Sequence, residues 1–320
     1  MAVYTPVDPA SLDRFLDGYD LGRALRLAGI AEGVENSNFH LETERGRYIL
    51  TIYERRVAPG DLPFFLGLME HLSQRGVPCP VPMHGRDGRL LHELCGRPAA
   101  IVSHLPGRSV MRVSAHHCAQ LGSALAELHL AGADFPLARA NDLSVRGWRP
   151  LFARSRARAD EVAPGLEDEI EAELAELERA WPTTLPSGVI HADLFPDNVF
   201  FEQGRITGLI DFYFAAVDLL AYDLAVCLNA WCFEPDGAFN ITKARQMLSA
   251  YRAIRPITPA ELEALPLLAR GAALRFLLTR LYDWLNQVAG ALVKPKDPLE
   301  YLAKLRFHKG LAGPGAYGLD

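Results

Sequence analysis

The first hundred residues alternate between helical and extended patterns of apolar positions. Apolar residues at helical spacing predict a helix over residues 11–30, capped by Ser11, and another over 60–76 that stops at Gly76. Short runs rich in β-branched and aromatic residues predict strand pairs joined at glycine turns. The predicted strands are 34–43, 47–54, 90–94 and 97–105. This order of elements is typical of a small α+β lobe.

The remainder of the chain has a mostly helical pattern, which begins after the break at residues 105–107. Apolar stripes predict a helix capped by Ser114 and two more helices over 166–181 and 267–288. Between these helices, "GVIHADLFPDNVFFEQGRITGLIDF" predicts an apolar strand, a polar loop and two short strands. The Gly-rich residues 310–320 predict a loose tail.

Length, charge and cysteine content exclude several classes of protein. A chain of 320 residues is long for a single core, so two lobes are expected. A net charge of −6 without a basic patch argues against a nucleic-acid partner. No apolar run approaches the ~18 residues of a membrane span, and the N-terminus does not resemble a signal peptide. Five cysteines without a CxxC pair predict free thiols, with Cys227 and Cys232 buried, and a cytoplasmic protein.

Three side chains with oxygen ligands lie near the ends of the predicted short strands. Asp193 follows the apolar strand, Asn198 lies in the polar loop, and Asp211 ends the last strand. A strand, loop and hairpin that bring them together would suit phosphoryl transfer. One carboxylate orients the attacking hydroxyl and takes its proton, while an Asn oxygen and a second carboxylate hold Mg²⁺ on the phosphate oxygens. A polar loop of capping Asp residues is the alternative to this interpretation.

The spacing of these residues resembles a known family. Asn198 follows Asp193 by five residues, and Asp211 lies 13 residues further on, before Phe212. "HADLFPDN" with the later "LIDF" resembles the aminoglycoside-phosphotransferase and choline-kinase-like superfamily, whose loop reads H-G-D-x-x-x-x-N before a later I-D-F. "LGSALAELH" and "IVSHLPG" extend the resemblance over most of the chain.

The resemblance implies an α+β, two-lobed protein-kinase-like fold with ATP and Mg²⁺ as cofactors. It places a small antiparallel-sheet, nucleotide-binding lobe at 1–102, a hinge at 103–107 and a larger, mainly helical catalytic and substrate lobe at 108–320. Asp193 would be catalytic, and Asn198 and Asp211 would hold the metal. The residues implied to bind nucleotide are Asn36, Ser37, Asn38, Ser103, His104 and Leu105.

Two further polar residues are expected to support this site. The resemblance implies that Asp223 braces the catalytic loop. The apolar surroundings of His191 favour a hydrogen-bonded structural histidine over a role in proton transfer.

The chain departs from the superfamily at one pair of positions. Most members carry a Lys in the third strand and a Glu on the next helix, where this chain has Thr51 and Phe65. No lysine precedes Lys243, so the difference is not an alignment shift. Losing both partners avoids leaving one charge unpaired in a cleft. Either the protein is an inactive nucleotide-binding relative, or other groups supply the positive field; retention of all three predicted catalytic and metal residues favours activity.

The chain resembles the bacterial homoserine kinases in "GVENSNFHLET", "LPFFLGLMEHLSQRGVPCPVP" and "LRFLLTRLYDW". That resemblance implies ATP-dependent phosphorylation of the L-homoserine hydroxyl, giving O-phospho-L-homoserine for threonine biosynthesis. Arg280 and Asp283 share a helix surface, where they could bind substrate or pair with each other. Tyr213 and Trp231 are further candidates for the pocket, with a core role open for Trp231. Kinases for choline, methylthioribose or an aminoglycoside are the alternatives.

Overall fold

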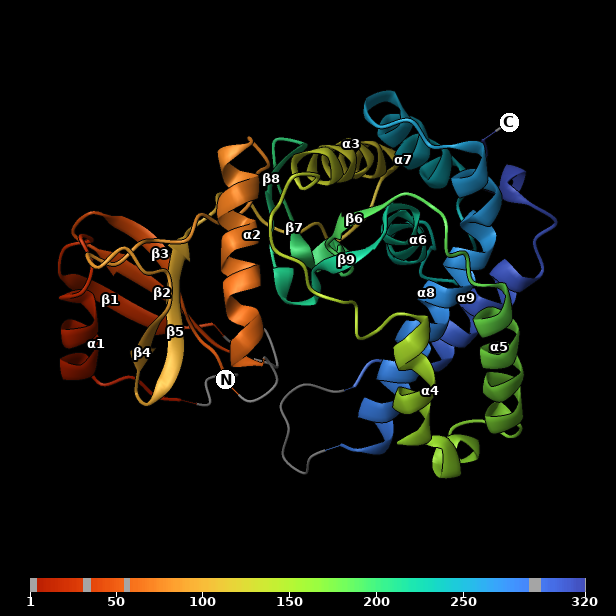
Figure 1. Ribbon diagram of the computed structural model, residues 1–320, viewed down its shortest axis with the longest axis horizontal. Coiled ribbons are helices and arrows are strands. Elements are labelled where there is room, and N and C mark those ends of the chain that lie inside the picture. The colour runs from red at the N-terminus through yellow and green to blue at the C-terminus, as the bar shows by residue number, and fades with distance from the viewer. Residues whose placement is uncertain (1–4, 31–35, 55–57, 288–294, 320) are drawn as a thin grey trace.

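A five-stranded antiparallel sheet forms one end of the protein in the computed structural model, which describes residues 5–30, 36–54, 58–287 and 295–319 (Figure 1). Its strands lie in the order β1-β2-β3-β5-β4. The predicted turn between β2 and β3 is confirmed by the pairing of Thr43 with Gly46, and the predicted hairpin by the pairing of Leu94 with Arg97. The strands are β1 (Ala24–Gly29), β2 (Ser37–Thr43), β3 (Gly46–Ile52), β4 (His92–Leu94) and β5 (Arg97–Ser103).

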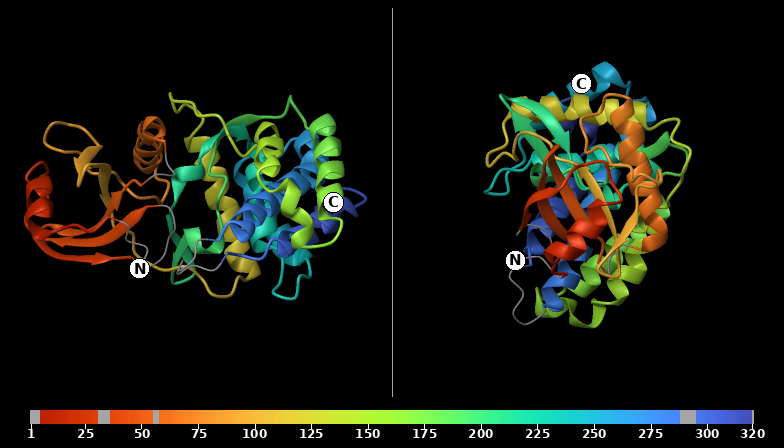
Figure 2. Two further views of the ribbon diagram at one scale, coloured as in Figure 1. Left: turned by 90° about the horizontal axis from the view of Figure 1, so that it is seen from below. Right: turned by 90° about the vertical axis from the view of Figure 1, so that its left-hand side faces the viewer.

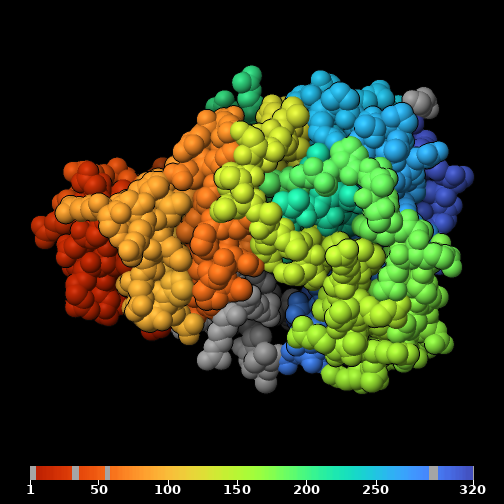
Figure 3. All heavy atoms as spheres, viewed as in Figure 1, coloured from red at the N-terminus to blue at the C-terminus, as the bar shows by residue number. Residues whose placement is uncertain are grey.

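The sheet separates a small core from a large one. Side chains alternate between the two faces of a strand, so Ala99 and Ile101 of β5 face the small core under α1 (Pro9–Leu16). Ala100 and Val102 face the large core, which includes α2 (Leu62–Gln74). Helix α2 therefore packs at the junction of the sheet and the helical part, as Figures 1 and 2 show. In the space-filling view, α2, in orange, touches the yellow-green segment that follows α3 (Ala115–Ala131) (Figure 3).

The larger part of the molecule is a helical assembly with two small β ribbons. Helix α3 packs along α7, and α8 packs against α6 and α9. Strand β6 pairs with β9, and β7 pairs with β8, both antiparallel. The elements are α3 (Ala115–Ala131), α4 (Val145–Ala153), η2 (Arg156–Glu161), α5 (Leu166–Ala180), β6 (Ser187–Ile190), η3 (Pro196–Asn198), β7 (Val199–Glu202), β8 (Arg205–Leu209), η4 (Phe212–Phe214), β9 (Ala216–Leu219), α6 (Leu220–Trp231), α7 (Ile241–Ile254), α8 (Pro259–Leu285), α9 (Leu299–Lys309) and η5 (Pro314–Tyr317), with η1 (Pro59–Asp61) preceding α2.

Local signals fix where several helices begin. The Ser114 hydroxyl accepts the His117 amide at 3.2 Å, and the His117 ring accepts the Ser114 amide, which confirms the predicted cap of α3. Thr258 and Glu261 form the same reciprocal arrangement at the start of α8. Such pairs satisfy amide groups that have no partner inside the helix.

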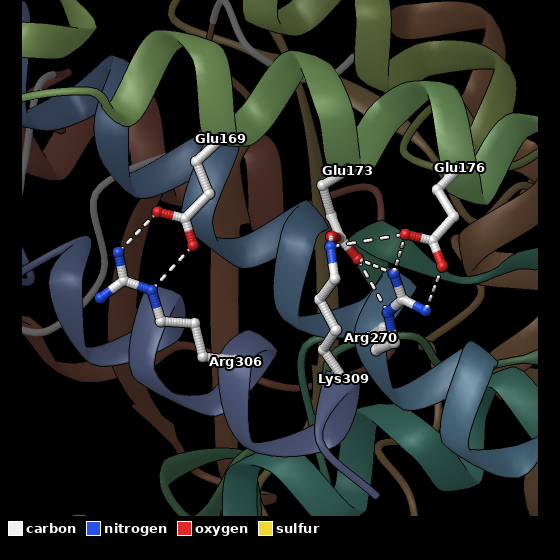
Figure 4. A network of polar contacts seen from close by, with 6 residues as sticks. All are labelled: Glu169, Glu173, Glu176, Arg270, Arg306 and Lys309. Carbon is white, nitrogen blue, oxygen red and sulfur yellow. Dashed lines mark hydrogen bonds and ion pairs between the residues drawn. The ribbon is translucent and has the colours of Figure 1, made fainter.

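A network of charged side chains holds α5, α8 and α9 together (Figure 4). Glu173 of α5 is almost fully buried and accepts from Arg270 of α8 and, at 2.7 Å, from Lys309 of α9. Glu169 accepts two bonds from Arg306, also of α9. Because a buried carboxylate is costly without partners, this network fixes how α8 sits against its neighbours.

Two predictions for the ends of the chain were wrong. The predicted helix over 11–30 ends at Leu16, and the strand β1 follows, after Gly22 adopts a positive φ of 76°. Its cap is Asp8, whose side chain accepts the Ser11 amide at 2.9 Å. The tail is not loose, because Tyr317 is fully buried and its hydroxyl lies 2.8 Å from Nδ1 of His308.

The cysteines and helices agree with the remaining expectations from composition. All five cysteines are free, and Cys227 and Cys232 are buried as predicted. Throughout the described ranges, none of the helices combines the length and apolar character that a bilayer span requires.

Candidate active site

The loop after β6 brings the predicted catalytic and metal residues to one cavity. The Asn198 amide nitrogen donates to the Asp193 carbonyl at 2.8 Å and to its carboxylate at 3.1 Å. Asp211 follows β8, whose partner β7 begins directly after Asn198. All three residues line a cavity of about 220 Å³. The three side chains therefore lie close together, as their spacing in the sequence predicted.

The side chain of Asp223 holds the backbone of this loop in place. This fully buried carboxylate accepts the amides of His191 and Ala192 at 2.7 and 2.8 Å, and a ring nitrogen of His129 lies 3.2 Å away. Burial by itself would raise the pKa of Asp223, but the hydrogen bond and charge of His129, with help from His191, lower it below the ordinary value. Asp223 is therefore an ionised anchor for the backbone just before Asp193.

His191 connects the loop to the strand that ends at Asp211. Its Nε2 lies 3.0 Å from the Ile210 carbonyl, and its Nδ1 accepts the Asp193 amide at 3.3 Å. These partners require a neutral ring protonated on Nε2. Burial lowers the pKa of His191 to about 4, which keeps the ring neutral near pH 7. The predicted structural role of His191 fits these contacts.

Two residues of this site have strained backbone conformations. Ala192 and Asp211 both adopt left-handed conformations, with φ of 64° and 67°. Such conformations cost non-glycine residues about 1–3 kcal/mol, and they persist where surrounding contacts fix them. The two hydrogen bonds of the Ala192 backbone, to Asp223 and Arg275, supply such contacts.

A second, larger cavity of about 610 Å³ also opens onto Asp193. Asp193 lines both cavities and so lies at their boundary. Helix α8 contributes Arg275, Phe276, Thr279, Tyr282 and Asp283 to the larger cavity.

Arg275 is a residue of this site that sequence reasoning missed. Its side chain is almost fully buried, donates to the Ala192 carbonyl and approaches an Asp193 carboxylate oxygen to 3.9 Å. The rings of Phe214 and Phe276 lie 5.4 and 4.5 Å from its guanidinium carbon. The available signal was an arginine inside the apolar stretch "GAALRFLL", because a charge on a buried helix face requires partners.

The Phosphotransferase enzyme family matches residues 26–257 of this chain. The chain belongs to this phosphotransferase family. A homoserine kinase of Xanthobacter autotrophicus is 65% identical over 319 residues, which cover 100% of this chain and 99% of the relative. A homoserine kinase of Rhodospirillum rubrum is 64% identical over 320 residues, 100% of both chains.

A solved structure confirms the fold of this phosphotransferase. An amicoumacin kinase in complex with AMP-PNP, Ca²⁺ and Ami superposes with a TM-score of 0.69 at 16% identity, covering 97% of this chain and 92% of that chain. The phosphotransferase thus has the predicted α+β, protein-kinase-like fold, with a small antiparallel sheet and a larger helical part.

The residues predicted to bind nucleotide form two groups: 36–38 at the start of β2, and 103–105 at the end of β5. The Asn36 and Ser37 side chains both bond to Glu54, and the Asn38 side chain accepts the Thr51 hydroxyl at 2.8 Å. Residues 31–35, which directly precede these three, lie outside the described residues. Nucleotide contact by these three residues stays a prediction.

The predicted hinge of the phosphotransferase follows β5. The Ser103 amide donates to the Val81 carbonyl at 2.8 Å, and the His104 amide donates to the Arg47 carbonyl at 3.4 Å. Leu105, which packs close to Gly208, has no such bond described. Two of the three backbone amides are therefore used within the fold, and contact of this segment with adenine stays a prediction.

The predicted substrate residues do not all lie in the larger cavity. Tyr213 and Asp283 line it as expected. Arg280 lines the smaller cavity instead, and it bonds to Glu300 at 2.6 Å and the Asp297 carbonyl at 3.0 Å rather than to Asp283.

Trp231 does not have the predicted position in the pocket. It is fully buried, and its indole donates to the Leu194 carbonyl at 2.6 Å. The ring therefore supports the catalytic loop from inside the core and is not placed to contact substrate.

The smaller cavity has the kind of donors that a hard cation requires. Asn198 and Asp211 both line it with oxygen-bearing side chains, which suit Mg²⁺. Within the described ranges, no group of three or more His, Cys, Asp or Glu residues gathers as a self-sufficient metal site. A cation here would complete its shell with oxygens from outside the protein, such as phosphate.

Proposed function

We propose that this phosphotransferase transfers the γ-phosphoryl group of ATP to the side-chain hydroxyl of L-homoserine, giving O-phospho-L-homoserine for threonine biosynthesis. Relatives named homoserine kinase are 60–65% identical over 98–100% of their length. The observation that carries the chemistry is the position of Asp193 at the boundary of two cavities. One cavity holds donors suited to a cation and phosphate, and the other has room for the acceptor alcohol.

Asp193 would be the catalytic base. Its carboxylate accepts the hydroxyl proton as the substrate oxygen forms its bond to the γ-phosphorus and the bond to the ADP oxygen breaks. Asn198 holds one carboxylate oxygen at 3.1 Å, and Arg275 lies 3.9 Å from the other. These contacts orient the carboxylate.

Asn198 and Asp211 would hold Mg²⁺ through their side-chain oxygens. When bound, Mg²⁺ neutralises charge on the phosphate oxygens during transfer. Of the described cations, Arg280 and Lys296 line the same cavity, and we assign to them the positive field that the missing strand lysine would supply. Lys296 is the more available of the two, because its carboxylate contact, to Asp197, is 3.8 Å long and exposed.

We assign ATP binding to the lobe at 1–102 and the hinge at 103–107, with substrate bound by the lobe at 108–320. The candidate nucleotide contacts remain residues 36–38 and 103–105, and Tyr213 and Asp283 remain candidate substrate contacts on the lining of the larger cavity. The five free cysteines support a cytoplasmic location, where thiols stay reduced.

A coupled ADP-release assay with Mg²⁺ and ATP tests the proposal. The acceptors are L-homoserine, L-serine, choline, methylthioribose and an aminoglycoside. We expect kcat/KM to be highest for L-homoserine. A higher value for another alcohol would replace the substrate, and no turnover with any acceptor would support an inactive nucleotide-binding protein.

A further inference from the structure

L-Homoserine differs from an ordinary amino alcohol by its α-carboxylate, which needs a cation in the cavity that receives it. Among the described residues, three arginines line the larger cavity: Arg139, Arg154 and Arg275. Their existing contacts decide which of them is available to a carboxylate.

Two of these arginines are already used by the protein. Arg139 pairs with Asp61 at 2.7 Å and with Asp142 at 2.9 Å, and its guanidinium lies 5.3 Å from the Phe65 ring. Arg275 is buried against the Ala192 carbonyl beside Asp193. Each of them has a partner whose loss would leave a charge uncompensated.

Arg154 is different. It follows α4, its side chain is exposed, and its guanidinium carbon lies 3.9 Å from the centre of the Tyr282 ring. No carboxylate in the described part of the chain forms an ion pair with it. A guanidinium stacked on an aromatic ring keeps its donors pointing outward in a fixed plane, so little order is lost when it binds an anion.

We propose that Arg154 binds the α-carboxylate of L-homoserine and determines specificity for amino-acid alcohols. This inference rests on the proposed function. Planar guanidinium groups match carboxylates through two parallel hydrogen bonds. Tyr282 is the support that fixes Arg154 at the wall of the cavity, and Asp193 lies at another part of the same wall.

The spacing of residues along α8 gives the scale of the larger cavity. Arg275, beside Asp193, and Tyr282, beneath Arg154, are seven residues apart on α8, which corresponds to about 10 Å along a helix. An extended L-homoserine spans ~5 Å from hydroxyl to carboxylate carbon. With a hydrogen bond of ~2.8 Å at each end, it bridges a comparable distance.

Arg280 is the other arginine considered for this role, but its surroundings suit it less. It lines the smaller cavity with the metal-type donors, and its guanidinium is bonded to Glu300 and stacked 4.4 Å from the Tyr301 ring. A second carboxylate would have to compete with Glu300.

The test compares two alcohols that differ only in the carboxylate: L-homoserine and 3-aminopropan-1-ol. Steady-state constants are measured for the wild type and for Arg154→Gln, Arg154→Lys and Arg146→Gln. Arg146 is the matched control, because it is an exposed arginine of α4, the helix that Arg154 follows, and it does not line the cavity. Thermal unfolding of each variant confirms that it is folded.

Arg154→Gln should raise KM for L-homoserine about 10- to 100-fold with little change in kcat, because charge-assisted bonds are lost. It should leave the constants for 3-aminopropan-1-ol within about twofold. Arg154→Lys should retain part of the preference, since it keeps the charge but not the paired donors. Arg146→Gln should behave as the wild type.

Three results would overturn the proposal: an unchanged KM for L-homoserine in Arg154→Gln, an equal loss for both alcohols, or an equal effect of Arg146→Gln. Wild-type enzyme that fails to phosphorylate L-homoserine at all would overturn the proposed function as well. If only the Arg154 assignment is wrong, the wild-type enzyme still phosphorylates L-homoserine.

Discussion

Replacing Asp223 by Asn should destabilise the protein strongly, although the two side chains have nearly the same shape. The carboxylate is fully buried and accepts from two backbone amides and one imidazole. Asparagine would put one acceptor oxygen and one donor nitrogen where the two carboxylate oxygens of Asp223 now accept hydrogen bonds. One buried donor, the Ala192 or His191 amide, would therefore face another donor.

The magnitude follows from these contacts. An unpaired buried donor costs about 1–3 kcal/mol, and each hydrogen bond that loses its charged partner weakens by roughly 1 kcal/mol. Together these effects predict a loss of about 3–5 kcal/mol in the free energy of unfolding, out of the ~5–15 kcal/mol typical of folded proteins. The loop that carries Asp193 should also lose order, so kcat should fall.

Urea unfolding followed by both circular dichroism and tryptophan fluorescence measures the effect. The control is Asp236→Asn, because Asp236 accepts one amide at 3.0 Å on an exposed turn, where water can replace it. We expect that control to change stability by less than about 1 kcal/mol. If Asp223→Asn is no more destabilising than Asp236→Asn, the view of Asp223 as a charged anchor is wrong.

Three further predictions concern the loop and its metal partner. Asp193→Asn should lower kcat by ~10²–10⁴ while ATP binding is retained, as coupled ADP release and nucleotide titration will measure; normal turnover would remove Asp193 from the mechanism. Asp211→Ala should abolish Mg²⁺-dependent turnover, and an unchanged Mg²⁺ titration would argue against its role as a ligand. Below pH 6.5 the unfolded chain takes up a proton on His191, whereas burial holds the folded pKa near 4. Stability should therefore fall by up to about 3 kcal/mol as the pH drops from 6.5 to 4; urea unfolding across this range should show the decline, and a stability that is flat or rises would contradict it.

Much of the fold could be predicted because local signals and tertiary contacts agree. The hairpins at Gly46 and Gly96, the cap at Ser114 and the helix over 60–76 each carry their own sequence signal, and the structure confirms them. The helix predicted over 11–30 failed because β1 is defined by pairing with β2, a partner distant from any local window. Its residues lack a clear alternation of buried and exposed positions.

Some residues of the site could be predicted from local sequence spacing, whereas others are placed only by tertiary packing. Asp193, Asn198 and Asp211 follow a spacing that the chain itself displays, and they meet at one cavity. Arg154 and Arg275 carry no motif, because they reach the larger cavity from α4 and α8, which are far apart in sequence. Only the packing of those helices brings them to the cavity that Asp193 lines.

The missing Lys and Glu pair illustrates how packing can replace an ion pair. Thr51 is buried and bonds to Asn38, so the strand position makes a neutral contact instead of carrying a charge. Phe65 of α2 packs edge-on against Tyr213, with ring centres 5.7 Å apart, and Tyr213 lies two residues after Asp211. Aromatic contact thus links α2 to the segment that carries Asp211. Salt weakens aromatic contacts little. The contact between Phe65 of α2 and Tyr213, close to Asp211, should therefore persist at ionic strengths that weaken an exposed ion pair.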